Sequence, residues 1–292
     1  MGRVAAISRA KQDIIRTFGT AQQRVFLKNE VAAVLRAKKH DWKLPERFSL
    51  SKFIEYLVDK TPMREVVLES EAYDPIVRFA WGDVSPYELF LSIRRGAYLS
   101  HATAIHLHGL SDLIPTMIYV NSEQSPKPQG GSLTQEALNR AFANRQRVSR
   151  FVYSDGTATA TFINGKNTQN LGVTEIGDPE SGRVFPATDL ERTLIDAAVR
   201  PVYAGGVSNV LDAYRGAKDT VSVNRLRAYL GKIGYLYPYH QSIGFFMERA
   251  GYPDRSLKRM RDLGMEHDFY LDYGLKKPDY DSGWRIFFPK GL

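Results

Sequence analysis

Three histidines stand close together in the first half of this 292-residue sequence, at His101, His106 and His108. Histidine is the commonest side chain to bind a metal ion in proteins. On a helix, however, His101 and His108 would share a face while His106 points elsewhere, which is not the i, i+4 spacing of a two-ligand pair. We therefore expect a structural role for these rings, with hydrogen bonds to nearby backbone, and we expect no metal site.

A second group is charged and comprises Asp189, Glu191, Arg192 and Asp196. Arg192 and Asp196 are four residues apart, which is the spacing of an ordinary ion pair on one helix face. The pattern therefore favours an exposed helix surface over a reactive site.

Tyrosines and phenylalanines are dense over residues 235–246 and could form a ligand-binding face. Such density more often belongs to a hydrophobic core. Both interpretations stay open on the sequence alone.

Catalytic signatures are absent from the sequence. It contains no G-x-S-x-G elbow, no phosphate-binding G-x-x-x-x-G-K-[ST] and no H-E-x-x-H. The Gly131-Ser132 pair lacks the D-x-D of a nucleotidyltransferase a turn later. We therefore expect a chain that is not an enzyme and needs no cofactor. The alternative is a nuclease or nucleotide-modifying enzyme built around a carboxylate such as Asp272 or Asp279.

The net charge of +8 is concentrated at the start of the chain. Residues 1–64 hold 14 Lys and Arg against 6 Asp and Glu, and the remaining residues hold 26 of each. A confined basic region attracts polyanions, because phosphates that meet Lys and Arg release condensed counterions. Basic faces are also often plain solvated surface. The charge therefore indicates a nucleic-acid partner only if the elements that carry it form a DNA-binding fold.

Those elements resemble a winged helix-turn-helix. Apolar residues at spacings of three and four predict helices over residues 11–18, 28–39 and 50–60, and a period of two predicts strands over residues 64–69 and 76–81. Three helices followed by a two-stranded ribbon place residues 50–60 in the position of a recognition helix. A small α+β module of another kind would show the same order of elements.

Double-stranded DNA is the partner that this arrangement predicts. Ser51, Lys52, Glu55 and Tyr56 lie on the outward face of the predicted recognition helix and are candidate base or phosphate contacts. Acidic residues crowd the ribbon turn, so we expect its flanks rather than its tip to touch the phosphates. The full set of expected DNA-binding residues is Lys28, Arg47, Ser49, Ser51, Lys52, Glu55, Tyr56, Arg64 and Arg78.

The expected fold class is α+β, with a winged helix-turn-helix over residues 1–82 and a larger mixed α/β domain over residues 83–292. In the second domain, Asn164-Gly165 has the composition of a tight hairpin turn, and Thr188 with Glu191 has the spacing of a helix capping box. The sequence has no cysteine and no apolar run long enough to span a bilayer. We expect a cytoplasmic protein without a membrane partner.

Three segments of the second domain resemble the AbiEi family of antitoxins from bacterial type IV toxin/antitoxin and phage-abortive systems. They are YLSHATAIHLHGL (98–110), ATDLERTLIDAAVRPVYAGG (187–206) and YPYHQSIGFFMERAGY (237–252). The resemblance covers residues 85–292, and the basic N-terminal region stands where that family carries its winged helix.

The resemblance implies a protein that represses its own operon by binding inverted repeats in the promoter. It also implies that the larger domain counteracts a cognate nucleotidyltransferase toxin. It supplies no catalytic residues. It also leaves open whether the matched positions stabilise the fold or act against the toxin. These positions include Ser100, His101, His108, Gly109, Arg192, Thr193, Asp196, Tyr203 and Gly205.

Overall fold

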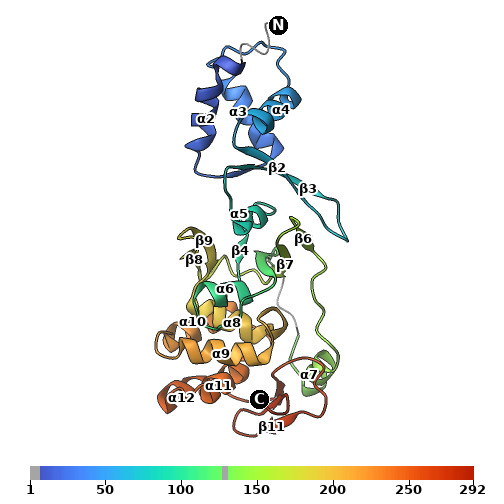
Figure 1. The fold of residues 1–292 in the computed structure, drawn as a ribbon. Coiled ribbons are helices and arrows are strands. Elements are labelled where there is room, and N and C mark those ends of the chain that lie inside the picture. Colours follow the sequence, from blue (N-terminus) through green and yellow to red (C-terminus); the bar gives the residue numbers. More distant parts are fainter. Residues whose placement is uncertain (1–6, 127–130) are drawn as a thin grey trace. The chain divides into compact units, whose positions relative to one another are not determined.

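The structure is a computed structural model that describes residues 7–126 and 131–292. The chain is a mixed α+β protein and forms two compact units (Figure 1). The first contains Met1–Arg95 and Phe151–Ala160, and the second contains Gly96–Arg150 and Thr161–Leu292. Within the described ranges, no helix is both long enough and apolar enough to cross a membrane.

The first unit consists mainly of three helices and a small antiparallel sheet with the strand order β1-β3-β2. All three predicted helices and both predicted strands are present, with ends that shift by one residue at most. In chain order the elements are α2 (Lys11–Gly19), β1 (Val25–Phe26), α3 (Lys28–Lys38), α4 (Leu50–Lys60), β2 (Met63–Leu68) and β3 (Ile76–Trp81).

Helix α4 is positioned by its cap and by its buried stripe. The Ser49 side chain accepts a hydrogen bond from the Lys52 amide (3.4 Å), as an N-cap residue does. Phe53 and Leu57 are fully buried against α2 and the sheet, where Phe18 stacks on Trp81 at 5.4 Å. The opposite face of α4 is therefore the face that remains exposed.

The tip of the β2–β3 ribbon is held by a second hairpin of the first unit, which contains β6 (Val152–Ser154). Glu69 and Ser154 exchange two backbone hydrogen bonds of 2.8 and 2.9 Å. The Tyr153 hydroxyl donates to the Asp74 carbonyl oxygen (2.9 Å), and Tyr73 packs edge-on against Phe151. The ribbon turn is thus fastened within its own unit.

The compact units differ from the division expected at residue 82. Helix α5 (Pro86–Leu91) belongs to the first unit, because Val84 and Leu89 pack against strand residues Val25 and Ala80. The hairpin around β6, within Phe151–Ala160, also belongs there, although residues 96–150 separate it from Arg95 in the sequence. Side-chain packing across distant segments sets both boundaries, and a local composition change does not reveal it.

The second unit contains a mixed sheet in which strands follow the order β7-β5-β4-β9-β8. β4 runs parallel to β9 and antiparallel to β5. The strands are β4 (Tyr98–Leu99), β5 (Ile118–Glu123), β7 (Thr159–Gly165, whose first two residues lie in the first unit), β8 (Val173–Gly177) and β9 (Val184–Thr188).

The hairpin expected at Asn164-Gly165 is wrong, because β7 and β8 are not neighbours in this sheet. Instead of turning, the chain at Gly165 lies against Asn121 of β5. The Gly165 amide donates to Asn121 Oδ1 (2.9 Å), and a Cβ at this position would be 2.6 Å from Asn121 Nδ2. The glycine therefore permits a close approach between two strands.

Helices of the second unit enclose its main hydrophobic core (Figure 1). They are α6 (His101–Leu107), α7 (Gln135–Phe142), α8 (Leu190–Val199), the 3-10 turn η1 (Pro201–Tyr203), α9 (Val207–Ala217), α10 (Val223–Ile233), α11 (Tyr239–Arg249) and α12 (Asp254–Arg261). Short strands β10 (Phe269–Tyr270), β11 (Asp279–Asp281) and β12 (Ile286–Phe288) form a separate sheet near the C-terminus.

Candidate functional site

The outward face of α4 is exposed at most of the expected contact positions. Ser49, Ser51, Lys52 and Glu55 are all exposed. Together they place hydroxyl, ammonium and carboxylate groups on one helix face, and such groups can bond to base edges and phosphates.

Tyr56 departs from this expectation, since it is half-buried. Burial raises the pKa of its hydroxyl, while a hydrogen bond with Ser8 and the charge of Lys60 act in the opposite direction. Beside it lies a hollow of about 510 Å³, lined by Ile7, Ser8, Lys11, Phe48, Lys52, Glu55, Tyr56, Asp59 and Lys60. Part of the Tyr56 ring therefore belongs to the wall of this hollow.

Three expected phosphate contacts are exposed and carry no ion pair with another residue of the described chain. These are Lys28, Arg47 and Arg64. Four other basic residues of the first unit do form ion pairs: Arg16 with Asp13 (3.6 Å), Lys38 with Asp41 (3.1 Å), Lys39 with Glu46 (3.8 Å) and Lys60 with Asp59 (2.8 Å). The uncompensated charges are the ones that a polyanion would neutralise most readily.

The expectation that Arg78 contacts phosphate is wrong, because this side chain is buried. Its guanidinium donates to Ser92 Oγ and to the carbonyl oxygens of Ser92 and Val77, at 2.9–3.0 Å. In strand β3, Arg78 lies on the opposite face from its neighbours Val77 and Phe79. Helix α5 and the turn after it cover the face of Arg78. Burial lowers the pKa of Arg78, although Glu30 opposes the shift. The residue ties β3 to the chain after α5.

The charged cluster of the second unit corrects another expectation, because it is not an exposed helix surface. Glu191, Arg192 and Asp196 are buried in α8, and only Asp189 is partly exposed. The helix cap is Asp189, whose Oδ1 accepts from the Arg192 amide (2.9 Å), in place of the expected Thr188–Glu191 box. Glu191 instead accepts the Ser222 amide of another segment (2.8 Å).

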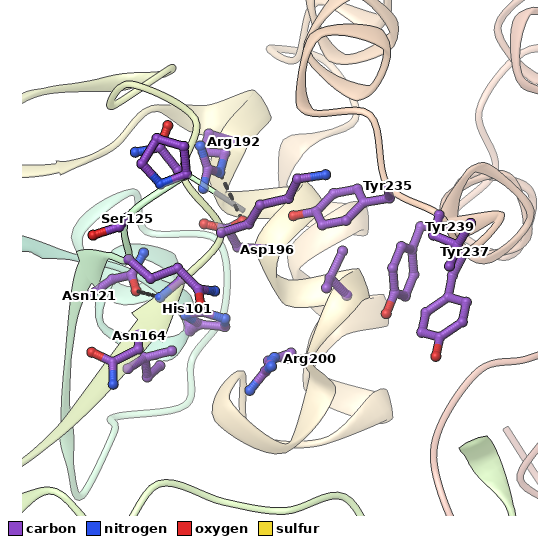
Figure 2. Close-up of a pocket in the computed structure, with 18 of the residues that line it drawn as sticks. His101, Asn121, Ser125, Asn164, Arg192, Asp196, Arg200, Tyr235, Tyr237 and Tyr239 are labelled. Carbon is purple, nitrogen blue, oxygen red and sulfur yellow. Dashed lines mark hydrogen bonds and ion pairs between the residues drawn. The ribbon is translucent and has the colours of Figure 1, made fainter. Parts of the chain in front are cut away.

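A cavity of about 520 Å³ lies where the three segments quoted for the resemblance come together (Figure 2). His101 comes from the first segment, Arg192, Asp196 and Arg200 from the second, and Tyr237 with Tyr239 from the third. The ends of β5 and β7 complete the wall with Asn121, Gln124, Ser125, Pro126, Ile163, Asn164, Gly165, Lys166 and Asn167. Segments far apart in the sequence thus contribute to one site.

Arg192 and Asp196 form a buried ion pair at this wall. Arg192 Nε donates to Asp196 Oδ1 (2.8 Å), and Nη1 donates to Thr168 Oγ1 (2.9 Å) and the Leu171 carbonyl oxygen (2.8 Å). Asp196 Oδ2 is also buried, yet no donor within the described residues reaches it. Burial raises the pKa of Asp196, while Arg192 acts against that shift. A carboxylate oxygen without a donor is costly in such a place.

His101 is the strained residue of the cavity. Its φ of 52° lies in the left-handed region, which few residues other than glycine adopt. Ser100 Oγ lies 2.9 Å from Nδ1, and the ring meets Tyr203 edge-on. Burial, with the charges of Arg200 and Arg192, lowers the pKa of His101 to about 3. The ring is therefore neutral at physiological pH.

The other two histidines lie outside the cavity. His108 Nε2 is 2.8 Å from the Thr188 carbonyl oxygen, which is the backbone contact expected from the sequence. His106 Nε2 is 3.8 Å from a carboxylate oxygen of Glu180. Among the described residues, no group of three or more His, Asp or Glu could hold a metal ion.

Arg200 and Lys166 bring two further cations to the cavity. Pro201 disfavours a helical conformation at Arg200, so α8 ends there and Arg200 adopts φ −139° and ψ 73°. The Arg200 guanidinium lies over the Tyr203 ring (5.8 Å) and hydrogen-bonds no group in the described ranges. Lys166 Nζ donates to the Gly234 carbonyl oxygen (2.6 Å). Burial lowers the pKa of Lys166.

Sequence reasoning did not select Asn121, Lys166 or Arg200 as site residues. The Arg200-Pro201 step was visible as a helix end, and a cation at that end could have been noted. Asn121 and Lys166 give no local signal, because only the strand order brings them together. The two carboxylates of the enzymatic alternative, Asp272 and Asp279, do not line the cavity.

No protein-family model matches the chain, and no curated protein matches it either. The chain is similar to the crystal structure of the Rv2827c protein from Mycobacterium tuberculosis, with a TM-score of 0.60 and 12% sequence identity. The similarity covers 94% of this chain and 89% of that chain. At this identity, the similarity describes a shared fold.

Proposed function

We propose that the chain is a non-enzymatic, DNA-binding repressor that also acts as an antitoxin. The observation that carries the DNA-binding part is the exposed face of α4 with Ser51, Lys52 and Glu55, flanked by the uncompensated charges of Lys28, Arg47 and Arg64. The order helix, strand, helix, helix, strand, strand, with the sheet order β1-β3-β2, supports a winged helix-turn-helix in which α4 is the recognition helix.

In this proposal α4 enters the major groove of double-stranded DNA in the promoter of its own operon. Lys52 and the hydroxyl groups beside it contact bases or phosphates. Lys28, Arg47 and Arg64 bind phosphates of the DNA backbone and so set the position of the protein on the duplex. The ribbon tip takes little part, because Glu69 and Asp74 are engaged with Ser154 and Tyr153. An operator with inverted repeats requires two copies of the chain, as a dimer or as cooperating monomers.

The antitoxin part of the proposal rests on the resemblance of residues 98–110, 187–206 and 237–252 to AbiEi antitoxins. The second unit would counteract a cognate nucleotidyltransferase toxin in the bacterial cytoplasm, as part of a phage-defence or abortive-infection system. Residues of all three segments line one cavity. This supports the proposal, because residues that line one site can take part in one function.

Two assays in cells test the two parts separately. A reporter gene placed behind the upstream region of this chain should be repressed by the wild type and released by the double variant Arg47→Ala, Lys52→Ala. The same double variant should still restore growth to cells that express the proposed cognate nucleotidyltransferase toxin. A reporter that the wild type leaves unrepressed would contradict the repressor, and growth arrest that persists with the wild type would contradict the antitoxin.

The enzymatic alternative has its own readout. Purified protein that degrades or modifies DNA, RNA or nucleotides with Mg²⁺ or Mn²⁺, and loses this activity in Asp272→Asn or Asp279→Asn, would replace the proposal.

A further inference from the structure

The cavity of the second unit has the size and the lining of a small-molecule site. Its volume of about 520 Å³ lies within the range of roughly 300–1,000 Å³ that is usual for ligand pockets. Tyrosines form one side, and charged or amide side chains form the others (Figure 2). This combination offers both stacking surfaces and directional hydrogen bonds.

The charge of the lining favours an anion. Lys166, Arg192 and Arg200 line the cavity together with a single carboxylate, Asp196. His101 is neutral, so the lining carries an excess of positive charge. Arg200 is the cation most available to a ligand, because it makes no hydrogen bond within the described residues and its planar guanidinium suits phosphate oxygens.

The carboxylate of the cavity requires a donor. Asp196 is 5% exposed, and its Oδ2 receives no hydrogen bond from the described residues, whereas Oδ1 is engaged by Arg192. A ligand that supplied an N–H or O–H to Oδ2 would remove the cost of this buried acceptor. A ligand with a donor in addition to its negative charge would match both features of the lining.

The tyrosines of the cavity favour a ligand that contains a flat ring. Tyr235, Tyr237, Tyr239 and Tyr273 line the cavity, and the hydroxyl end of Tyr235 points toward Asp196 in Figure 2. Tyr235 and Tyr239 pack edge-to-face at 5.0 Å, which holds their rings in fixed orientations. Fixed aromatic rings bind planar groups, and bases stack on them without strong sequence preference.

We propose that this cavity binds a nucleoside phosphate, with the phosphate at Arg200 and Lys166, the base against the tyrosines and a base or ribose donor on Asp196 Oδ2. This inference goes beyond the repressor and antitoxin functions, since it concerns a ligand of the second unit by itself. It holds or fails whatever DNA or toxin the chain binds.

Calorimetric titration of the purified full chain with each of the four ribonucleoside 5′-monophosphates tests the inference. Inorganic phosphate and the four unphosphorylated nucleosides are the matched probes. We expect at least one nucleotide to bind, and to bind at least tenfold more tightly than either inorganic phosphate or its own nucleoside. No binding of any nucleotide at millimolar concentration would overturn the inference, and so would equal binding of inorganic phosphate.

Two arginine variants locate the site. Arg200→Gln should keep the fold, because the guanidinium makes no hydrogen bond within the described chain, and it should weaken nucleotide binding about tenfold or more. Arg259→Gln removes the same charge from the exposed side of α12 and should leave binding unchanged. Equal affinity of the wild type and Arg200→Gln would overturn the inference.

A third comparison separates this cavity from the basic first unit. The double variant Arg47→Ala, Lys52→Ala should bind the nucleotide as the wild type does. A loss of binding in that variant would place the nucleotide on the DNA-binding face and overturn the assignment to the cavity.

Discussion

Lys52 and Arg47 are exposed and lie outside the core of the first unit, so their charges are free to act on a partner. We expect the double variant Arg47→Ala, Lys52→Ala to weaken operator binding and to flatten its dependence on salt, because fewer counterions are released. Its free energy of unfolding should stay within about 0.5 kcal/mol of the wild type.

The matched control removes two positive charges from α12, as Arg255→Ala, Arg259→Ala. Both positions are exposed, so the net charge changes equally. This control should retain the DNA affinity and the salt slope of the wild type. A folded Arg47, Lys52 variant with unchanged affinity would show that α4 is not the recognition helix.

Arg78 and Arg64 lie on adjacent strands, but Arg78 is buried and Arg64 is exposed. Arg78→Ala removes three hydrogen bonds from a buried guanidinium and leaves the Ser92 carbonyl oxygen without this donor. We expect a loss of about 1–3 kcal/mol in the free energy of unfolding, measured with urea. Arg64→Ala should change stability by less than about 0.5 kcal/mol while weakening DNA binding. The reverse order of stability losses would contradict the assigned roles.

His101 predicts a dependence of stability on pH. Its pKa is about 3 in the native state against an ordinary value of 6.5, so between these values the unfolded chain binds a proton that the native chain does not. Stability from this residue is fully present above pH 6.5 and is lost as the pH falls, by about 1.4 kcal/mol per pH unit.

The variant His101→Asn checks that dependence, because asparagine tolerates a left-handed φ better than most residues. Between pH 7 and pH 5 the wild type should lose about 2 kcal/mol more stability than the variant. His240, whose pKa is also lowered by burial, is present in both proteins and does not affect the difference. Parallel losses in the two proteins would mean that His101 is not held neutral in the folded state.

The packing of helix α11 depends on a glycine that faces a tryptophan. A Cβ at Gly244 would lie 2.0 Å from Cζ3 of Trp284, which is fully buried. Gly244→Ala should therefore destabilise the protein by about 1–3 kcal/mol through overpacking, as thermal and urea unfolding would report.

Gly231 of α10 provides the control for this substitution. No atom lies within 4 Å of a Cβ built there, so the same change to alanine should stabilise the protein by about 0.5–1 kcal/mol. Two substitutions of the same kind with the same sign of effect would contradict the packing described for α11.

Elements with a strong local pattern could be predicted from the sequence. α4 and β3 have the predicted ends, because their apolar periods and the Ser49 cap are properties of consecutive residues. Asn164-Gly165 misled the prediction, since the turn preference of that pair is weaker than the strand contacts with Asn121. Turn composition indicates where a chain can reverse, while the order of strands decides whether it does.

The candidate site was less accessible to sequence reasoning than the fold. Arg192 and Asp196 have the spacing of a surface pair, but Arg192 is hydrogen-bonded to Leu171 and Thr168, which are 21 and 24 residues earlier in the chain. Gly172 allows that approach, because a Cβ there would be 2.8 Å from the Arg192 Cβ. The sequence leaves open whether the tyrosines of residues 235–239 form a ligand face or core; in the structure they line the cavity and also belong to or pack against the main core.

In our proposals, each of the two compact units carries one kind of binding. The first unit carries the uncompensated basic charges that suit DNA, and the second carries a cavity that suits a small anion. The DNA-binding residues and the cavity residues do not overlap, so variants of one surface serve as controls for the other. The proposed repression, toxin neutralisation and nucleotide binding can therefore be tested separately on one chain.

In our proposal, the first unit recognises a specific DNA sequence. The most direct measurement is a titration of the purified chain against a labelled fragment of its own upstream region and against an unrelated fragment of equal length, at two salt concentrations. Sequence-specific contacts survive added salt better than the phosphate contacts shared by both fragments. We expect tighter binding to the upstream fragment, with a preference that persists at the higher salt. Equal binding to both fragments that disappears at the higher salt would contradict sequence-specific recognition and leave only a basic surface.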